Sequence, residues 1–184
     1  ELSVVCRANN LVLSVDNPVP QFTGFYNRKE QGIVADYVII MGYDEHTTGS
    51  EEAGSVASLP FVKEGIEKTL QEVPKEKVIN GIPFYTRLWT ESNNGTLSSE
   101  VMTMDQASEY VQNNGIEVYW EKATAQNYGE LLTDNGTQKI WLEDEQSIEE
   151  KMKLIEQYGL AGVASWKLGF ERADVWTIIS EYLQ

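Results

Sequence analysis

One uninterrupted apolar run, residues 37–41 with the sequence YVIIM, constrains the fold more than any other stretch. The run does not alternate with polar residues and is rich in β-branched side chains, which is typical of a strand covered on both faces in a parallel sheet. Its carboxyl end continues into residues 42–46, which supply a phenol, two carboxylates and the single histidine of the chain. Because α/β folds place their chemistry where parallel strands end, we expect a functional site here.

Similar apolar runs predict three more strands, with helical patterns between them. Together the predicted strands cover residues 11–15, 35–43, 77–85 and 160–166. Apolar residues recur at helical spacing from Leu59 to Val73 and from Ile148 to Tyr158, and a capping-box pattern begins at Ser147. A last helix is expected over residues 173–182. Each connection is long enough for a strand–helix–strand crossover, so the sequence predicts an α/β fold with parallel strands.

The regular alternation breaks between the third and fourth predicted strands. A capping-box pattern predicts a helix over residues 104–113, and residues 116–120 alternate like a strand. A turn signal at residues 134–136 predicts a hairpin of strands 128–133 and 138–143. We therefore predict two units, one made of residues 1–90 with 146–184 and the other a small α+β insertion at 91–145.

The first residues of the chain resemble the end of a helix. Residues 1–10 place apolar side chains on one side and finish with two asparagines, as in a chain cut from something longer. Residues 25–33 predict a short helix or an irregular segment. Cys6 stands alone, so the chain cannot form an internal disulfide and Cys6 is interpreted as a small buried hydrophobe. No apolar run is long enough to cross a bilayer, and no signal-peptide pattern opens the chain.

The charge of the chain limits its partners. Lys and Arg number 14 against 29 Asp and Glu, which gives a net charge of −15. Nucleic acids and anionic membranes need a basic surface, so neither is an expected partner. An uncharged sugar is easier to accommodate, although the charge could also serve solubility alone. No phosphate-binding glycine motif, second histidine or HExxH pattern is present, so we predict no cofactor and no metal.

Aromatic and polar side chains gather at three predicted strand ends. Sugars suit such a site, because their C–H faces stack on aromatic rings while carboxylates and guanidinium groups bind their hydroxyls. A plainer interpretation stays open, in which the tyrosine packs on the rim, the aspartate caps the next loop and the tryptophan belongs to the core. We assign no role to His46 and expect Glu45 to lie on a solvated loop. The strand-end residues are Met41, Tyr43 and Asp44, then Tyr85 and Arg87, then Trp166.

Three motifs, in the same order along the chain, resemble family 18 glycoside hydrolases. Residues 35–46 (ADYVIIMGYDEH) are similar to the family's Met-x-Tyr-Asp strand, and residues 77–89 (KVINGIPFYTRLW) to its Gly-x-Pro-x-Tyr-x-Arg-x-Trp strand. Residues 159–169 (GLAGVASWKLG) are similar to its last strand, which ends in a tryptophan. The resemblance is to the carboxyl-terminal half of the catalytic domain, in particular that of bacterial spore-germination and cortex-lytic N-acetylglucosaminidases.

The resemblance implies a (β/α)8 TIM barrel, of which the four predicted strands are the fifth to eighth. It also implies substrate-assisted hydrolysis, in which the N-acetyl carbonyl of the sugar attacks its own anomeric carbon. Tyr43 would donate a hydrogen bond to the acetamido group and stabilise the oxazolinium-like intermediate. Met41 and Asp44 would line the same subsite.

The remaining roles implied by the resemblance concern the walls of the site. Trp166 would lie under the sugar ring, and Tyr85 and Arg87 would bind hydroxyls or a neighbouring sugar. Trp120 of the insertion would wall one side of the groove. Gly42 occupies a position that varies in the family.

The family's catalytic signature, Asp-x-x-Asp-x-Asp-x-Glu, does not occur in the 184 residues, so the general-acid glutamate is missing. We expect the full-length protein to cleave β-1,4 bonds of N-acetylglucosamine-containing polysaccharide, peptidoglycan or chitin, outside the cell or in a bacterial cell envelope. We expect this chain alone to be inactive.

Two alternatives stay open. One is a non-catalytic chitinase-like lectin, which the upstream sequence would distinguish by the presence or loss of the glutamate. The other is self-association of the half-barrel through its unpaired edges.

Overall fold

The computed structural model describes residues 1–183 and contains a four-stranded parallel sheet. β2 (Tyr37–Met41) pairs with a strand on each edge, and every pairing in this sheet is parallel. The predicted α/β class and the order of the four predicted strands are confirmed. In order across the sheet, the strands are β1 (Ser14–Pro18), β2, β3 (Val78–Pro83) and β9 (Gly162–Trp166).

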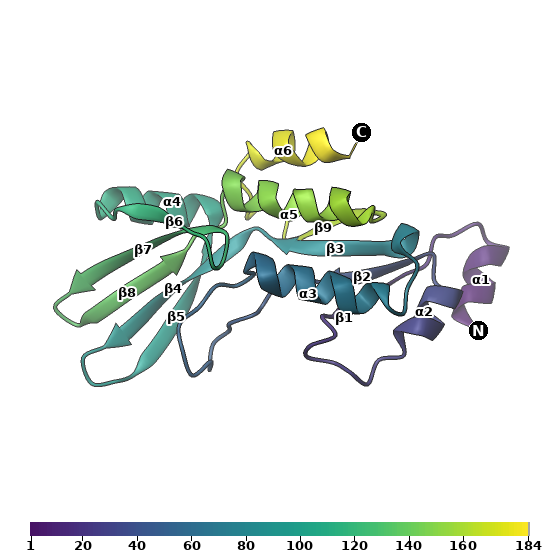
Figure 1. The fold of residues 1–184 in the computed structure, drawn as a ribbon, viewed down its shortest axis with the longest axis horizontal. Coiled ribbons are helices and arrows are strands. Elements are labelled where there is room, and N and C mark those ends of the chain that lie inside the picture. The colour runs from purple at the N-terminus through teal and green to yellow at the C-terminus, as the bar shows by residue number, and fades with distance from the viewer. Residues whose placement is uncertain (184) are drawn as a thin grey trace.

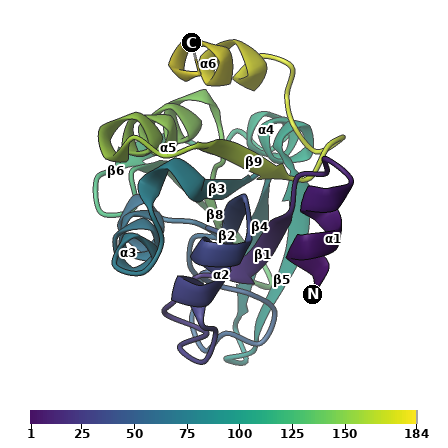
Figure 2. The same cartoon turned by 90° about the vertical axis from the view of Figure 1, so that its right-hand side faces the viewer.

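Helices cover one face of the parallel sheet (Figure 1). Val38 and Ile40 of β2 form a buried cluster with residues of α3 (Leu59–Leu70), among them Ile66. Ile82 of β3 belongs to a second cluster with α5 (Glu145–Tyr158) and α6 (Val175–Tyr182). Figure 2 shows α3 and α5 side by side along the sheet, with α6 outside α5. Burial of these apolar side chains fixes the helical layer on this face.

The opposite face of the parallel sheet is open. Along β2, buried residues alternate with Ile39 and Met41, which keep accessible surface, and Tyr37 is 37% exposed. The expectation that this strand is covered on both faces is therefore wrong for the described residues. In a closed barrel, strands from the other side would cover this face, and the described part of the chain supplies only four parallel strands.

A five-stranded antiparallel sheet follows β3, at the end of the parallel sheet where its strands finish (Figure 1). α4 (Met104–Asn113) connects two of its strands, as predicted, and the predicted hairpin around residues 134–136 is confirmed. The sequence patterns miss the hairpin of β4 and β5. The sheet also begins ahead of residue 91, where we placed the start of the insertion. Its strands, in order across the sheet, are β5 (Leu97–Thr103), β4 (Tyr85–Ser92), β8 (Gly136–Trp141), β7 (Gln126–Thr133) and β6 (Val118–Glu121).

The first parallel strand is shifted relative to its prediction. β1 begins at Ser14, and Leu11 and Val12 are 59% and 70% exposed. The strand continues into polar residues because Asn17 exchanges two side-chain hydrogen bonds with Gln31, of 2.8 and 3.1 Å. Paired amide groups can be buried at little cost, so tertiary contacts override the apolar pattern here.

The start of α5 also differs from its prediction. Asp144, rather than Ser147, is the N-cap. The Ser147 amide donates to the Asp144 carboxylate and the Asp144 amide donates to the Ser147 hydroxyl, both at 3.0 Å. The helix ends at Gly159 in the left-handed conformation, with φ +61°, which glycine adopts readily at helix C-caps.

The remaining helices lie at the amino-terminal side of the parallel sheet. They are α1 (Leu2–Ala8), α2 (Arg28–Val34) and a short 3-10 helix at Lys75–Lys77. Cys6 is buried and unpaired, as expected of a small hydrophobe. Within residues 1–183, no helix has the length and hydropathy needed to span a bilayer.

A buried polar cluster joins the second sheet to the loop that follows β2. Glu143 accepts hydrogen bonds from Lys151 at 2.9 and 3.1 Å, from Ser147 at 2.9 Å and from Gln126 at 2.9 Å. Gln126 in turn accepts a hydrogen bond from the hydroxyl of Ser55. All five residues are buried. The cluster therefore connects the β2–α3 loop, β7 and α5 through side chains whose polar groups satisfy one another.

Candidate functional site

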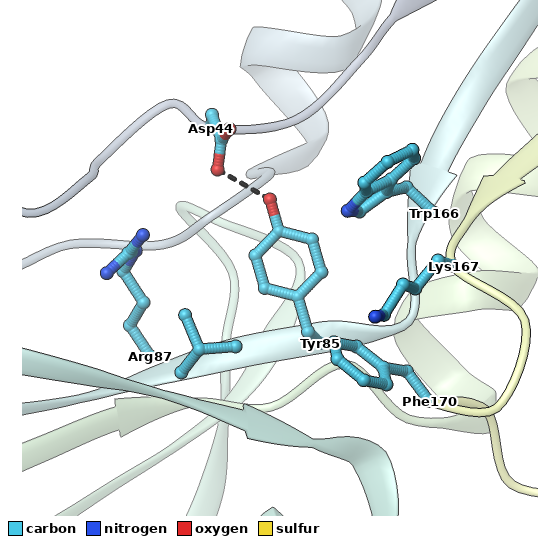
Figure 3. Close-up of a pocket in the computed structure, with 7 residues that line it drawn as sticks. Asp44, Tyr85, Arg87, Trp166, Lys167 and Phe170 are labelled. Atoms are coloured by element: carbon cyan, nitrogen blue, oxygen red, sulfur yellow. Dashed lines mark hydrogen bonds between the residues drawn. The ribbon is translucent and has the colours of Figure 1, made fainter.

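A pocket of about 330 Å³ opens where the parallel strands end and the second sheet begins (Figure 3). The end of β9 and the loop after it contribute Trp166, Lys167 and Phe170. The loop after β2 contributes Asp44. Tyr85, Arg87 and Val101 come from β4 and β5 of the second sheet. The pocket therefore lies at the position where α/β barrels carry their chemistry.

Close backbone contacts turn the chain after β2 toward this pocket. A Cβ atom on Gly42 would lie 2.6 Å from the Asn80 side-chain oxygen and 2.8 Å from the Gly81 carbonyl oxygen, so glycine is required there. Gly81 in turn leaves room for the ring of Tyr43, which a Cβ would meet at 3.3 Å. Asp44 has a φ of +63°, in the left-handed region that aspartate adopts more readily than most residues.

The two tyrosines and Asp44 form a connected group. The Tyr85 hydroxyl donates a hydrogen bond of 2.5 Å to Asp44 Oδ1, and the Tyr43 and Tyr85 rings meet edge to face with centroids 6.3 Å apart. Burial, together with the charges of Asp44 and Asp16, raises the pKa of Tyr43 to about 12. Burial and the hydrogen bond to Asp44 raise the pKa of Tyr85 well above its ordinary value. Both phenols therefore stay protonated at neutral pH and can donate hydrogen bonds.

Arg87 and Trp166 lie on opposite sides of Tyr85 (Figure 3). Arg87 Nη1 donates to the hydroxyls of Thr48 and Ser99, at 2.9 and 3.2 Å, which holds the guanidinium at the pocket wall. Trp166 is 54% exposed, so it is an accessible aromatic surface rather than a core side chain. The interpretation of Trp166 as a core residue is wrong, because the sheet face it lies on is the open one.

Of the remaining predicted site residues, Met41 and Tyr43 lie close to Trp166, whereas Trp120 does not. Met41 and Tyr43 line a smaller cavity of about 130 Å³ that also reaches Trp166, so the structure brings these three together. Trp120 lies in β6, at the opposite edge of the second sheet from β5, and does not line this cavity or the pocket in Figure 3. The structure therefore does not bring Trp120 together with the other predicted residues.

Three residues that line the pocket were not predicted from the sequence. Lys167 and Phe170 follow β9, and the Lys167 ammonium group lies 4.5 Å from the centre of the Phe170 ring. Val101 comes from the unpredicted β5. The position of Lys167 directly after the tryptophan motif was a usable signal, whereas Val101 could not be placed without knowing the register of β5 on β4.

Glu45 and His46, which follow Asp44, hold the next loop. Glu45 accepts hydrogen bonds from the Ser58 amide at 2.8 Å and the Ser58 hydroxyl at 3.0 Å, at the start of α3. Glu45 therefore lies in the loop, as expected, but is half-buried and bound to the start of α3 rather than fully solvated. His46 Nδ1 lies 2.9 Å from the Ser55 carbonyl oxygen. Among the described residues, no group of three or more acidic, histidine or cysteine side chains is placed to hold a metal ion.

Similarity to known proteins identifies the family of this chain. Residues 3–171 match the family described as Glycosyl hydrolases family 18. Because the match covers most of the chain, the protein belongs to this family. One relative is a cortical fragment-lytic enzyme of Bacillus subtilis, 28% identical over 158 residues, which are 85% of this chain and 36% of the relative. The chain spans less than half the length of this and the other leading curated relatives that it matches.

Solved structures share the fold of the chain. A chitinase of Chromobacterium violaceum superposes with a TM-score of 0.88 at 24% identity, over 99% of this chain and 58% of that one. The spore cortex-lytic enzyme SleL of Bacillus megaterium superposes with a TM-score of 0.85 at 22% identity, over 98% of this chain and 43% of that one. These likenesses confirm the prediction of a partial (β/α)8 barrel.

Proposed function

We propose that this protein forms the sugar-binding wall of a glycoside hydrolase that cleaves β-1,4 bonds in N-acetylglucosamine-containing polysaccharide. The observation that carries the proposal is the convergence of Tyr43, Asp44, Tyr85 and Trp166 on connected cavities at the strand ends of a family 18 chain. Both phenols are donors, the indole is an open apolar surface, and Asp44 is a strong acceptor. This combination matches the alternating apolar faces and hydroxyl edges of a sugar.

In the proposed reaction, the acetamido group of the sugar is the nucleophile, so this wall supplies no attacking carboxylate. Tyr43 donates a hydrogen bond to the acetamido oxygen as it attacks the anomeric carbon. Asp44, held by Tyr85, accepts from the acetamido N–H, and this orients the group. Met41 lines the same subsite and Trp166 stacks under the ring. The general acid that protonates the leaving oxygen is not among the 184 residues.

Peptidoglycan and chitin are the two candidate polymers. Relatives of this chain are named as a cortical fragment-lytic enzyme and as endochitinases. A protein that acts on either polymer works outside the cell or in the cell envelope, where we propose this one acts.

Binding and hydrolysis assays on the 184-residue chain test the proposal. We expect chitotriose to bind, with a change in tryptophan fluorescence from Trp166, and we expect no release of reducing sugar because the general acid is absent. Absence of binding by any chitin oligosaccharide would contradict the sugar-binding role. Turnover by a contaminant-free sample would contradict the inactivity of the chain. Binding without hydrolysis by a longer form that includes the upstream sequence would favour the lectin alternative.

Self-association is a second candidate, favoured by the open face of the parallel sheet. Tyr37, Ile39 and Met41 keep accessible surface there. Exposed apolar side chains that lie together are typical of a surface that binds protein. Light scattering after size exclusion distinguishes the outcomes, since a concentration-independent monomer would contradict pairing of two copies.

A further inference from the structure

The loop between β2 and α3 leaves the parallel sheet and lies against the second sheet (Figure 1). It carries Tyr43 and Asp44 at its start and contains no helix or strand. Its second half, from Gly54 to Ser58, is nevertheless buried. Irregular backbone that is buried must find its hydrogen-bond partners outside regular secondary structure, so side-chain contacts have to hold this loop.

The half of the loop that carries Asp44 is bonded to the buried half. The Glu45 amide donates to the Val56 carbonyl at 2.8 Å. His46 Nδ1 lies 2.9 Å from the Ser55 carbonyl oxygen. Because Glu45 and His46 directly follow Asp44 in the chain, the position of Asp44 depends on where Ser55 and Val56 are held.

The Ser55 hydroxyl anchors the buried half to the second sheet. It accepts a hydrogen bond from the Ala57 amide at 2.9 Å and donates one to Gln126 Oε1 on β7. Gln126 is 0% exposed, and its Nε2 donates to Glu143 Oε1 at 2.9 Å. A chain of hydrogen bonds therefore runs from the loop through Gln126 to the buried pair of Glu143 and Lys151.

The charge of Glu143 sets the direction of every bond in this chain. An ionised carboxylate only accepts hydrogen bonds, so the amide of Gln126 must turn its NH2 group to Glu143 and its oxygen to Ser55. The Ser55 hydroxyl must then donate to that oxygen, which leaves its lone pairs free for the Ala57 amide. Lys151 stabilises the ionised form of Glu143, so the buried pair determines how the loop is held.

We propose that Gln126 is a positioning residue of the sugar site, which fixes Asp44 by tying its loop to the buried pair. The inference rests on the proposed function and adds a residue that cannot touch the sugar, since Gln126 lines neither the pocket in Figure 3 nor the cavity at Tyr43. Asp44 follows the parallel sheet and Tyr85 belongs to the second sheet, so their hydrogen bond requires the loop to be docked.

Calorimetric titration with chitotriose at about pH 8, above the pKa of Glu143, tests this role. Gln126→Met keeps the length of the side chain but removes its hydrogen bonds, and the affinity should fall about fivefold. Ser55→Ala removes only the hydroxyl, leaves the contacts of Glu143 in place and should cause a similar loss. Native affinity in both variants would overturn the positioning role.

Ile140→Val is the matched control in the second sheet. Ile140 is buried in a cluster with Leu88 and with Ala107 of α4, and it belongs to β8 rather than to the chain of hydrogen bonds. Lost packing should lower the thermal midpoint of this variant, as lost hydrogen bonds do in Gln126→Met. The chitotriose affinity of Ile140→Val should equal that of the native protein, and a loss as large as that of Gln126→Met would overturn the proposal.

An Asp44→Ala background separates positioning from a general loss of stability. If Gln126 acts through Asp44, then Gln126→Met should weaken binding by less than about twofold once Asp44 is alanine, because coupled residues are not additive. A full fivefold loss in that background would show that Gln126 acts elsewhere and would overturn the proposal.

Hydrogen exchange measures the same anchoring without a sugar. The amides of Glu45 and Ala57 are bonded within the loop, so both should exchange about fivefold faster in Gln126→Met than in Ile140→Val. Equal protection in the two variants would overturn the role of Gln126. Absence of chitotriose binding by the native protein would overturn the proposed function and the positioning role with it, whereas native binding that the variants retain would overturn the positioning role alone.

Discussion

Polar side chains are accessible at the ends of the parallel strands but buried at the joint to the second sheet. The joint is the buried polar cluster of Ser55, Gln126, Glu143, Ser147 and Lys151. At the strand ends, Trp166 is 54% exposed, and Asp44 and Tyr85 line a cavity open to ligands. At the joint, the Glu143 and Lys151 side chains are each 1% exposed and satisfy one another. The joint therefore fixes geometry and stability, whereas the strand ends keep their polar groups available for recognition.

Removing one partner of the buried pair should have the largest effect. Lys151→Met removes the cation that opposes the upward shift of the Glu143 pKa. The Glu143 carboxyl must then stay charged without a partner or take up a proton, and breaking a buried ion pair costs about 3 to 5 kcal/mol of unfolding free energy. Denaturant titration at about pH 8, where Glu143 is charged, measures the loss. Lys153→Met is the matched control on the same helix, because Lys153 forms only exposed pairs with Glu149 and Glu150. The control should stay within about 0.5 kcal/mol of the native protein, and a Lys151 variant as stable as this control would refute the distinction.

The same carboxyl should make stability depend on pH. Burial raises the pKa of Glu143 to about 7, against the opposing effects of Lys151 and Ser147. Because this value lies above the ordinary carboxyl pKa, the native state holds a proton that the unfolded state releases. The contribution of Glu143 to stability is therefore complete below about pH 4.5 and is lost as the pH rises to about 7, at no more than about 1.4 kcal/mol per pH unit.

Glu143→Gln isolates this titration. The variant has no ionisable group at this position, so the native-minus-variant difference in unfolding free energy should fall between about pH 5 and about pH 7 and then level off. Two stability profiles that stay parallel across this range would mean that Glu143 does not change protonation there.

Local sequence patterns predict the strand ends but not the buried cluster at the joint. The apolar runs of β2, β3 and β9 identify the parallel sheet, and the residues after them place Tyr43, Asp44 and Trp166 at its ends. Those predictions succeed because strand burial and strand-end chemistry are encoded locally. The joint depends on partners far apart in the chain, such as Ser55 and Gln126, and no local pattern marks such a pair.

Trp120 and the boundary of the second sheet show the same limit. Its aromatic character made Trp120 a reasonable groove residue, but the strand order places β6 at the edge opposite β5. Only Phe84 separates the end of β3 at Pro83 from the start of β4 at Tyr85, so the switch from the parallel to the antiparallel sheet occurs inside one continuous apolar pattern. Both facts depend on strand pairing, which periodicity does not specify.

Two tryptophan variants sharpen the contrast between the sheets through binding. Trp166→Ala removes the exposed aromatic surface of the strand ends and should weaken chitotriose binding about tenfold, which corresponds to about 1.4 kcal/mol. Because the indole is half exposed, the thermal midpoint should change little. Trp120→Ala should leave the affinity unchanged, since Trp120 lies outside the described cavities of the site. Calorimetric titration measures both affinities. A larger loss of chitotriose affinity in Trp120→Ala than in Trp166→Ala would contradict this assignment.

The smallest effect should come from a single phenol hydroxyl, for which the two sheets offer matched pairs. Tyr85 donates to Asp44 at the site, and Tyr128 donates to Glu130 within the second sheet. Tyr85→Phe frees Asp44 to rotate toward water, and a net hydrogen bond of about 1 kcal/mol predicts a two- to fivefold loss of chitotriose affinity. Tyr128→Phe removes the same kind of bond and should leave the affinity unchanged. Equal losses in the two variants would show that the hydrogen bond acts through general stability, whereas a loss confined to Tyr85→Phe assigns it to the orientation of Asp44.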